Sequence, residues 1–186
     1  MLWVKRAAVT RETLAAAKAR HHVPLSVRAT VYRRWQPAAR VGQPRSGAQI
    51  DIGSADDTLY LVPGWYFSED IGGVQARWVG ERPTSTLRID LTPRQHVLRL
   101  RGLAYPAGQL LTVEVNGHAV ASVPLAQTWT VYTVRVPAEH ILAGEPTQLD
   151  LIHRSFSSPH DATNGQSPDK RTLAAAYDWL SVEPLR

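Results

Sequence analysis

The stretch from Gly64 to Trp78 holds the residues best suited to grip a polar ligand that has flat, apolar faces. Gly64-Trp-Tyr-Phe-Ser-Glu-Asp70 places three aromatic rings between turn residues, and Gly72-Gly73 follows. An indole can stack on the apolar face of a sugar while neighbouring charged groups take its hydroxyls. The sequence therefore predicts an aromatic loop whose ligand contacts are Trp65, Tyr66, Glu69, Arg77 and Trp78.

The same tryptophans have a second interpretation. Six Trp and six Tyr against two Phe favour rings that carry a polar handle, and such rings serve both interfaces and cores. Trp65 and Trp78 could therefore close the end of a hydrophobic core instead of meeting a ligand. Trp129 and Trp179 lie within predicted strands, so we expect them to be packing residues.

Catalytic chemistry has little support. The sequence contains no G-x-S-x-G, P-loop, G-x-G-x-x-G or H-E-x-x-H motif. Asp56, Asp57, Glu69 and Asp70 could supply an acid and a base for glycoside cleavage, but acids in turns are mostly solvated or capping groups. We predict no catalytic residues.

Metal and cofactor sites are not expected either. The loop around residues 160–170 offers Asp161, Asn164 and Asp169, but their spacing does not match a calcium loop. His153 and His160 are predicted to lie at the surface or rim. With no cysteine, disulfides are excluded.

Alternating patterns predict an all-β fold for residues 47–186. In Thr86–Leu91, the apolar residues Leu87, Ile89 and Leu91 share one face, as in a half-buried strand. Asn116-Gly117 is typical of a hairpin turn. Similar runs occur at 98–101, 111–115, 119–123, 129–136, 148–153 and 176–182. About nine or ten short strands without long helices indicate an antiparallel β-sandwich or jelly roll.

A basic arm, residues 1–46, precedes this domain. Its first 45 residues hold ten Lys/Arg and one acid, a net charge of +9, whereas the other 141 hold 11 basic and 15 acidic residues, a net charge of −4. A short helix is expected between Thr10 and His22, followed by an extended segment. Such an arm favours a protein partner or an anionic membrane surface over nucleic acid. Its predicted contacts are Arg28, Arg33, Arg34 and Trp35.

Several motifs in the second part of the chain resemble a known module. They include Ile50-Asp-Ile-Gly53, Gly64-Trp-Tyr66, Ala76-Arg-Trp78, Asp169-Lys-Arg-Thr-Leu173 and Ala176-Tyr-Asp-Trp-Leu180. Their order is similar to the soluble, carbohydrate-binding-module-like β-sandwich that follows the membrane part of some bacterial glycosyltransferases using polyprenyl-linked sugars. The resemblance implies an extracytoplasmic, non-catalytic module, because the catalytic acids of those transferases lie in the membrane part.

Two hypotheses follow. The first is a non-catalytic carbohydrate-binding accessory domain whose partner is a glycan or a membrane protein. The second is a structural subunit of a larger assembly, at a membrane or elsewhere, that docks through its basic arm. A location outside the cytoplasm or at a membrane is expected, although the sequence shows neither a signal peptide nor a run of apolar residues that would span a bilayer.

Overall fold

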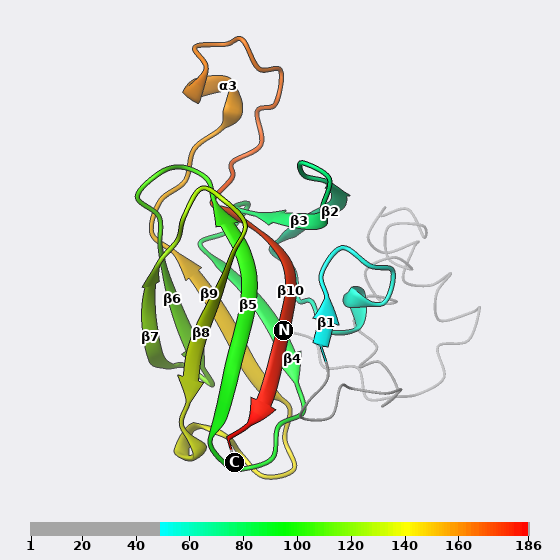
Figure 1. Ribbon diagram of the computed structural model, residues 1–186, viewed down its shortest axis with the longest axis vertical. Helices are drawn as coiled ribbons and strands as arrows, with labels where there is room; N and C mark the ends of the chain where they lie inside the picture. Colours follow the sequence, from blue (N-terminus) through cyan, green and yellow to red (C-terminus); the bar gives the residue numbers. More distant parts are fainter. Residues whose placement is uncertain (1–48, 186) are drawn as a thin grey trace, which may run out of the picture. The chain divides into compact units, whose positions relative to one another are not determined.

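The structure, a computed structural model, describes residues 49–185. These residues form two antiparallel sheets that are stacked face to face (Figure 1). In the first sheet the order is β2 (Trp65–Asp70), β3 (Gln75–Val79), β10 (Ala175–Pro184), β5 (His96–Ala104) and β8 (Thr130–Val136), and β1 (Gln49–Asp51) also pairs with β10. In the second sheet the order is β4 (Thr84–Ile89), β9 (Thr147–His153), β6 (Leu110–Val115) and β7 (His118–Pro124). The prediction of an all-β antiparallel sandwich is confirmed.

Alternation along the strands decides which side chains enter the core. In β5, Leu98 and Leu100 are fully buried and pair with Val134 and Tyr132 of β8, which are also buried. Residues directly opposite each other in neighbouring strands share one face of a sheet. Each strand of the first sheet therefore has an inner set facing the second sheet and an outer set facing away from it.

The segment predicted as an aromatic loop is not a loop. Gly64–Trp78 falls largely in β2 and β3, which pair as an antiparallel hairpin. Its pairing register shifts between Trp65 and Ser68, and such a bulge disturbs the regular alternation that would have revealed the strand. The Gly72-Gly73 turn, with φ of 65° and 84°, needs backbone angles that glycine adopts without strain.

The chain between β1 and β2 reaches from the first sheet to β4 of the second sheet. The Ile52 amide donates to the Asp178 carbonyl at 2.6 Å, and the Val62 amide donates to the Thr86 carbonyl at 3.0 Å. Between these points lies a short 3-10 helix, η1 (Asp57–Leu59). Residues 53–62 therefore run along the edge of the sandwich next to β2 and β3 and bring Asp57 to its interior.

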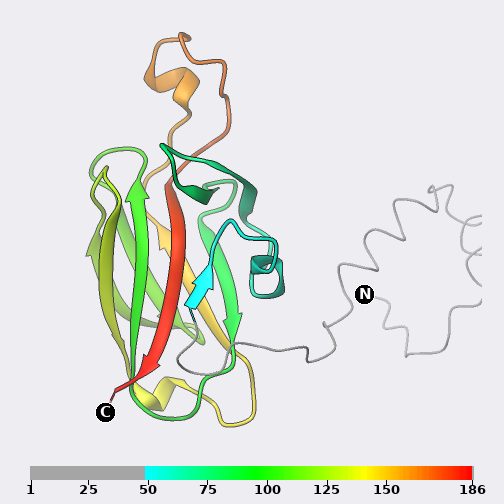
Figure 2. The same cartoon turned by 45° about the vertical axis from the view of Figure 1, so that its right-hand side comes forward.

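A long loop, residues 154–174, projects from one end of the sandwich and carries the short helix α3 (Pro159–Ala162) (Figures 1 and 2). The Ser158 hydroxyl accepts from the Asp161 amide and caps the helix. At the base of the loop, Ser157 and Leu173 form an isolated β-bridge. The second 3-10 helix, η2 (Ala138–His140), lies at the opposite end of the sandwich.

The surface location predicted for His153 is wrong. Its side chain is buried at the end of β9, and its Nε2 lies 2.8 Å from the Tyr177 hydroxyl. Burial lowers the pKa of His153 to about 4, so the ring is neutral at physiological pH. The error arose because a single polar residue at the end of an apolar run carries no sequence signal of burial.

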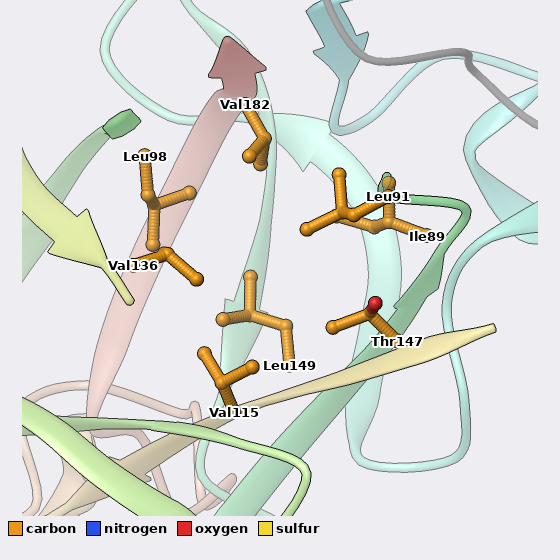
Figure 3. Close-up of a pocket in the computed structure, with 8 residues that line it drawn as sticks. All are labelled: Ile89, Leu91, Leu98, Val115, Val136, Thr147, Leu149 and Val182. Atoms are coloured by element: carbon orange, nitrogen blue, oxygen red, sulfur yellow. The ribbon is translucent and has the colours of Figure 1, made fainter. Parts of the chain in front are cut away.

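A small cavity lies between the sheets at the end opposite the long loop (Figure 3). Its volume of about 10 Å³ is no more than one water molecule requires. The lining is apolar apart from Thr147, whose hydroxyl has no hydrogen-bond partner within residues 49–185. This cavity is a packing feature of the core and not a ligand site.

The basic arm lies outside the described residues. This applies to its predicted helix, to the predicted contacts Arg28, Arg33, Arg34 and Trp35, and to the boundary at residues 46 and 47, all of which stay predictions. Within residues 49–185, no helix has the length and apolar character needed to cross a membrane.

Candidate functional site

The five predicted contact residues divide between the two faces of the β2–β3 hairpin. Arg77 pairs with Ser68 and Tyr177, and it lies on the inner face. Trp78 pairs with Ala176 and therefore lies on the outer face. The prediction treated both as one cluster, but adjacent residues of a strand point in opposite directions.

Arg77 forms a buried ion pair inside the sandwich edge. Its Nε lies 2.5 Å and its Nη2 2.9 Å from the two carboxylate oxygens of Asp57, while Nη1 donates to the Tyr66 carbonyl at 2.9 Å. The Asp57 side chain has no exposed surface and also accepts from the Gly53 amide. A bidentate pair of this kind fixes residues 53–59 against the hairpin, so Arg77 has a structural role in this geometry.

Trp65 also faces inward. Its indole N–H donates to the Thr86 carbonyl at 3.2 Å, and its ring meets Tyr177 edge to face with centroids 5.8 Å apart. The hydrogen bond links the first sheet to the second, because Thr86 lies in β4, whereas Tyr177 lies in β10 of the same sheet as Trp65. Trp65 therefore matches the alternative interpretation, in which the tryptophan closes the end of the core.

Tyr66 and Glu69 meet the base of the long loop through Arg171. Arg171 Nη1 lies 2.6 Å from Glu69 Oε1, and its Nη2 lies 2.8 Å from Asp169 Oδ2. The same guanidinium lies over the Tyr66 ring, 5.4 Å from its centroid, and the Tyr66 hydroxyl donates to the Thr172 carbonyl at 3.1 Å. About a third of each charged side chain remains exposed, from 28% for Asp169 to 37% for Glu69.

These contacts also set the charge states. Hydrogen bonds from Arg171 lower the pKa of Asp169, and hydrogen bonds to Asp169 and Glu69 raise the pKa of Arg171. Partial burial, followed by the charge of Glu81, raises the pKa of Tyr66. At neutral pH the cluster therefore holds a charged Arg171 guanidinium next to the charged Asp169 carboxylate, beside a protonated Tyr66 phenol.

Trp78 lies on the same outer face as Glu69. Glu69 pairs with Ala76 on β3, and Ala76 and Trp78 are two residues apart, so the three side chains share a face. Trp78 is half-buried and meets the ring of Tyr105 edge to face at 5.9 Å. Tyr105 follows β5 and is held by its amide, which donates to the Ala174 carbonyl.

We call this arrangement the rim site. It consists of Tyr66, Glu69, Trp78, Tyr105, Asp169 and Arg171, all near the end of the sandwich from which the long loop projects.

Sequence reasoning missed half of the rim site. The sequence presents Asp169 only as a candidate metal ligand and Arg171 only as part of the motif Asp169–Leu173. Both lie about 100 residues from Glu69, and no local pattern connects positions so far apart. Tyr105 precedes Pro106 in a turn-like segment, where nothing marks an aromatic as a neighbour of Trp78.

The carboxylates considered for glycoside cleavage have separate local roles. Asp57 belongs to the buried pair, Glu69 binds Arg171, and Asp70 accepts from the Gly73 amide at 3.0 Å within the hairpin turn. Asp56 is exposed and precedes η1. The calcium ligands considered in the long loop are similarly engaged, since Asp161 accepts from the Ser158 hydroxyl and Asp169 binds Arg171.

Comparisons of sequence give no relatives: no family model matches the chain, and no curated protein matches it. Comparisons of structure give several carbohydrate-binding modules. A family 36 module in complex with calcium and xylotriose has 15% identity and a TM-score of 0.45, over 73% of this chain and 99% of that one. A family 35 module from Clostridium thermocellum has 13% identity and a TM-score of 0.46, over 74% and 99%. A β-1,3-glucan binding family 6 module from Bacillus halodurans has 13% identity and a TM-score of 0.45, over 76% and 98%.

Proposed function

We propose that the protein is a non-catalytic glycan-binding module and that its rim site holds the sugar. The observation that carries the proposal is the juxtaposition of the aromatic pair Trp78 and Tyr105 with the partly exposed cluster Glu69, Asp169 and Arg171. Sugars present flat C–H faces to aromatic rings and a rim of hydroxyls to charged acceptors and donors.

The charged cluster is preorganised for this purpose. Arg171 binds both carboxylates, and the carboxylate oxygens of Glu69 and Asp169 retain lone pairs that can accept from sugar hydroxyls. Since Arg171 also rests on the Tyr66 ring, its position does not depend on a ligand. A site whose groups are already in place loses less conformational entropy on binding.

The formal charge of the cluster also supports a sugar. One guanidinium and two carboxylates give a net charge of −1 to the cluster, which disfavours phosphate and other anions. The long loop beside it supplies hydroxyl and amide groups but is internally hydrogen-bonded, for example by the His160 amide to the Asp169 carbonyl at 2.8 Å. A neutral or cationic sugar suits these surroundings better than an acidic one.

The test is a glycan array followed by titration of the best binder with tryptophan fluorescence as the signal. We expect binding by the wild type and a loss of at least about tenfold in affinity for Trp78→Ala, equal to about 1.4 kcal/mol. His118→Ala is a matched control, because it removes an aromatic ring at the opposite end of the sandwich, where His118 stacks on His140. No response to any glycan, or equal affinities for all three proteins, would contradict the proposal.

A second function is supported by the charge distribution. The first 45 residues carry +9 and the remainder −4, an arrangement that suits docking on an acidic protein or lipid surface. For this role, removal of residues 1–45 should abolish association with vesicles containing anionic lipid at low salt, where screening is weakest. Unchanged association after that deletion would exclude docking through the arm.

A further inference from the structure

Three of the four tryptophans of the described residues reach the outer side of the first sheet, and two of them keep an unused hydrogen-bond donor. The indole N–H of Trp65 donates to Thr86, and that of Trp129 donates to the Ile71 carbonyl at 3.4 Å. The indole N–H groups of Trp78 and Trp179 have no partner among residues 49–185. A fully buried indole usually finds a hydrogen-bond partner within the protein. The rings of Trp78 and Trp179 are partly exposed, so their N–H groups can donate to a ligand.

Trp78 and Trp179 lie on the same face. Trp78 is opposite Ala176, which is opposite Leu103 of β5. Trp179 is opposite Arg101 of β5, which is opposite Val131 of β8. In a regular strand, Trp179 would point inward like Tyr177, because residues two apart share a face. The bulge between Tyr177 and Trp179 adds one residue to the strand, so Trp179 points outward instead.

The separation of the two rings follows from strand geometry. Their partners on β5, Leu103 and Arg101, are two residues apart, and β3 and β10 are neighbouring strands. Two residues along a strand and one strand across correspond to about 8 Å between the Cα atoms of Trp78 and Trp179. Two platforms at this spacing cannot both stack on one monosaccharide, but they can stack on separate units of one chain.

Between and below these rings, the face is polar but balanced in charge. Arg101 lies over the Trp129 ring at 5.3 Å and binds Asp178 at 2.5 Å. Arg99, next along β5, binds Glu183 at 3.1 Å. Arg101 and Arg99 each have a carboxylate partner, and the exposed Arg135 of β8 on the same face is matched in number by the exposed Asp51 of β1, which lies opposite Trp179. The described part of the face therefore lacks the net positive charge that an anionic polymer or a phospholipid surface would require.

From this we infer that the rim site is one end of a longer track, on which an uncharged oligosaccharide binds by internal units along the outer face of β3, β10 and β5, with Trp179 as its second platform. This inference rests on the proposed function, because Trp78 is shared between the rim site and the track. It adds that the ligand is the middle of an extended, neutral chain and not a terminal or free monosaccharide.

The test compares the dimers and hexamers of the cello-, xylo- and manno-oligosaccharide series by isothermal titration calorimetry. We expect the hexamer of at least one series to bind the wild type about tenfold more tightly than its dimer. Trp179→Ala should remove this advantage and leave dimer affinity unchanged, and Trp179→Phe should restore part of it because a ring remains. Val131→Ala, on the same face but in the edge strand β8, should behave as the wild type.

Each other result has a definite meaning. If Trp179→Ala and Trp179→Phe are folded and keep the full hexamer advantage, the track is overturned while glycan binding at the rim site stands. If Trp78→Ala binds every oligosaccharide as the wild type does, or if the wild type binds none, the proposed function and the track both fail. If the wild type self-associates in solution and Trp179→Ala does not, the face belongs to a second copy of the chain, which also overturns the track.

Discussion

The two faces of the β2–β3 hairpin and its β10 neighbour carry the same kinds of residue for different purposes. On the inner face, Trp65 and Arg77 are held by Thr86, Tyr177 and Asp57. On the outer face, Trp78 has an unpaired indole N–H within the described residues, and Glu69 and Arg171 remain partly exposed. Strand alternation, more than residue type, therefore separates groups that stabilise the fold from groups that can meet a ligand.

The largest expected effect comes from breaking the inner ion pair. Asp57→Ala leaves the Arg77 guanidinium, whose side chain is 13% exposed, without its counter-charge. We expect the free energy of unfolding to fall by about 3–5 kcal/mol, as for other buried pairs that lose one partner. Urea denaturation measures this. The matched control is Glu183→Ala, whose pair with Arg99 is 41–50% exposed and should contribute less than about 1 kcal/mol.

The second effect is a pH dependence of the free energy of unfolding, caused by the buried His153. Because burial lowers the pKa of His153 from 6.5 to about 4, the unfolded state binds a proton more readily than the folded state below pH 6.5. Stability from this group is complete above pH 6.5 and is lost as the pH falls towards 4, by about 3 kcal/mol in total. Burial lowers the pKa of His96 as well, so its contribution has the same sign.

The His153→Leu variant isolates this effect in urea denaturation at several pH values. It should be less stable than the wild type at pH 7, since the Tyr177 hydroxyl loses its partner, but its stability should decline less between pH 6.5 and 4. Equal declines in both proteins would show that His153 does not carry the dependence.

The third effect compares the two tryptophans of the hairpin directly. Trp65→Ala removes an inter-sheet hydrogen bond and core contacts, and we expect a loss of about 2–3 kcal/mol for this half-buried ring. Trp78→Ala removes mainly the edge-to-face contact with Tyr105 and should lose about 1 kcal/mol. If thermal or urea unfolding gave Trp78→Ala the larger loss, the assignment of the two faces would have to be reversed.

The smallest effect on stability is expected at Arg171. Arg171→Lys keeps the charge but cannot hold two carboxylates with a planar fork. Since the side chain is 34% exposed, the free energy of unfolding should change by less than about 1 kcal/mol. Glycan affinity should nevertheless fall, because Glu69 and Asp169 lose their fixed positions. Unchanged affinity would remove the charged cluster from the rim site.

Much of the fold could be predicted because most strands are half-buried and alternate regularly. Leu111, Val113 and Val115 of β6 are fully buried, as their spacing predicted, and Asn116-Gly117 makes the turn with φ of 49° and 83°. The β2–β3 hairpin was missed because a bulge at Tyr66 and Phe67 interrupts the alternation, and because aromatic residues between glycines also occur in loops.

The candidate site was less predictable for a physical reason. The sequence pattern indicated Tyr66, Glu69 and Trp78, which the structure places on or beside the outer face. It could not show that Arg77 forms an ion pair with Asp57. Nor could it bring Arg171 to Glu69 or Tyr105 to Trp78. Such pairs depend on how strands distant in sequence are ordered in the sheet, and this order is not written in any local pattern.

The most direct test of glycan binding by the outer face is the response of the indole N–H signals in a heteronuclear NMR titration with the best-binding oligosaccharide. Single Trp→Phe variants assign the signals. The Trp78 signal should shift on binding, while that of Trp65, bonded to Thr86 inside the sandwich, should stay in place. A shift at Trp65 without one at Trp78, or no shift at saturating concentrations of any glycan, would contradict the account.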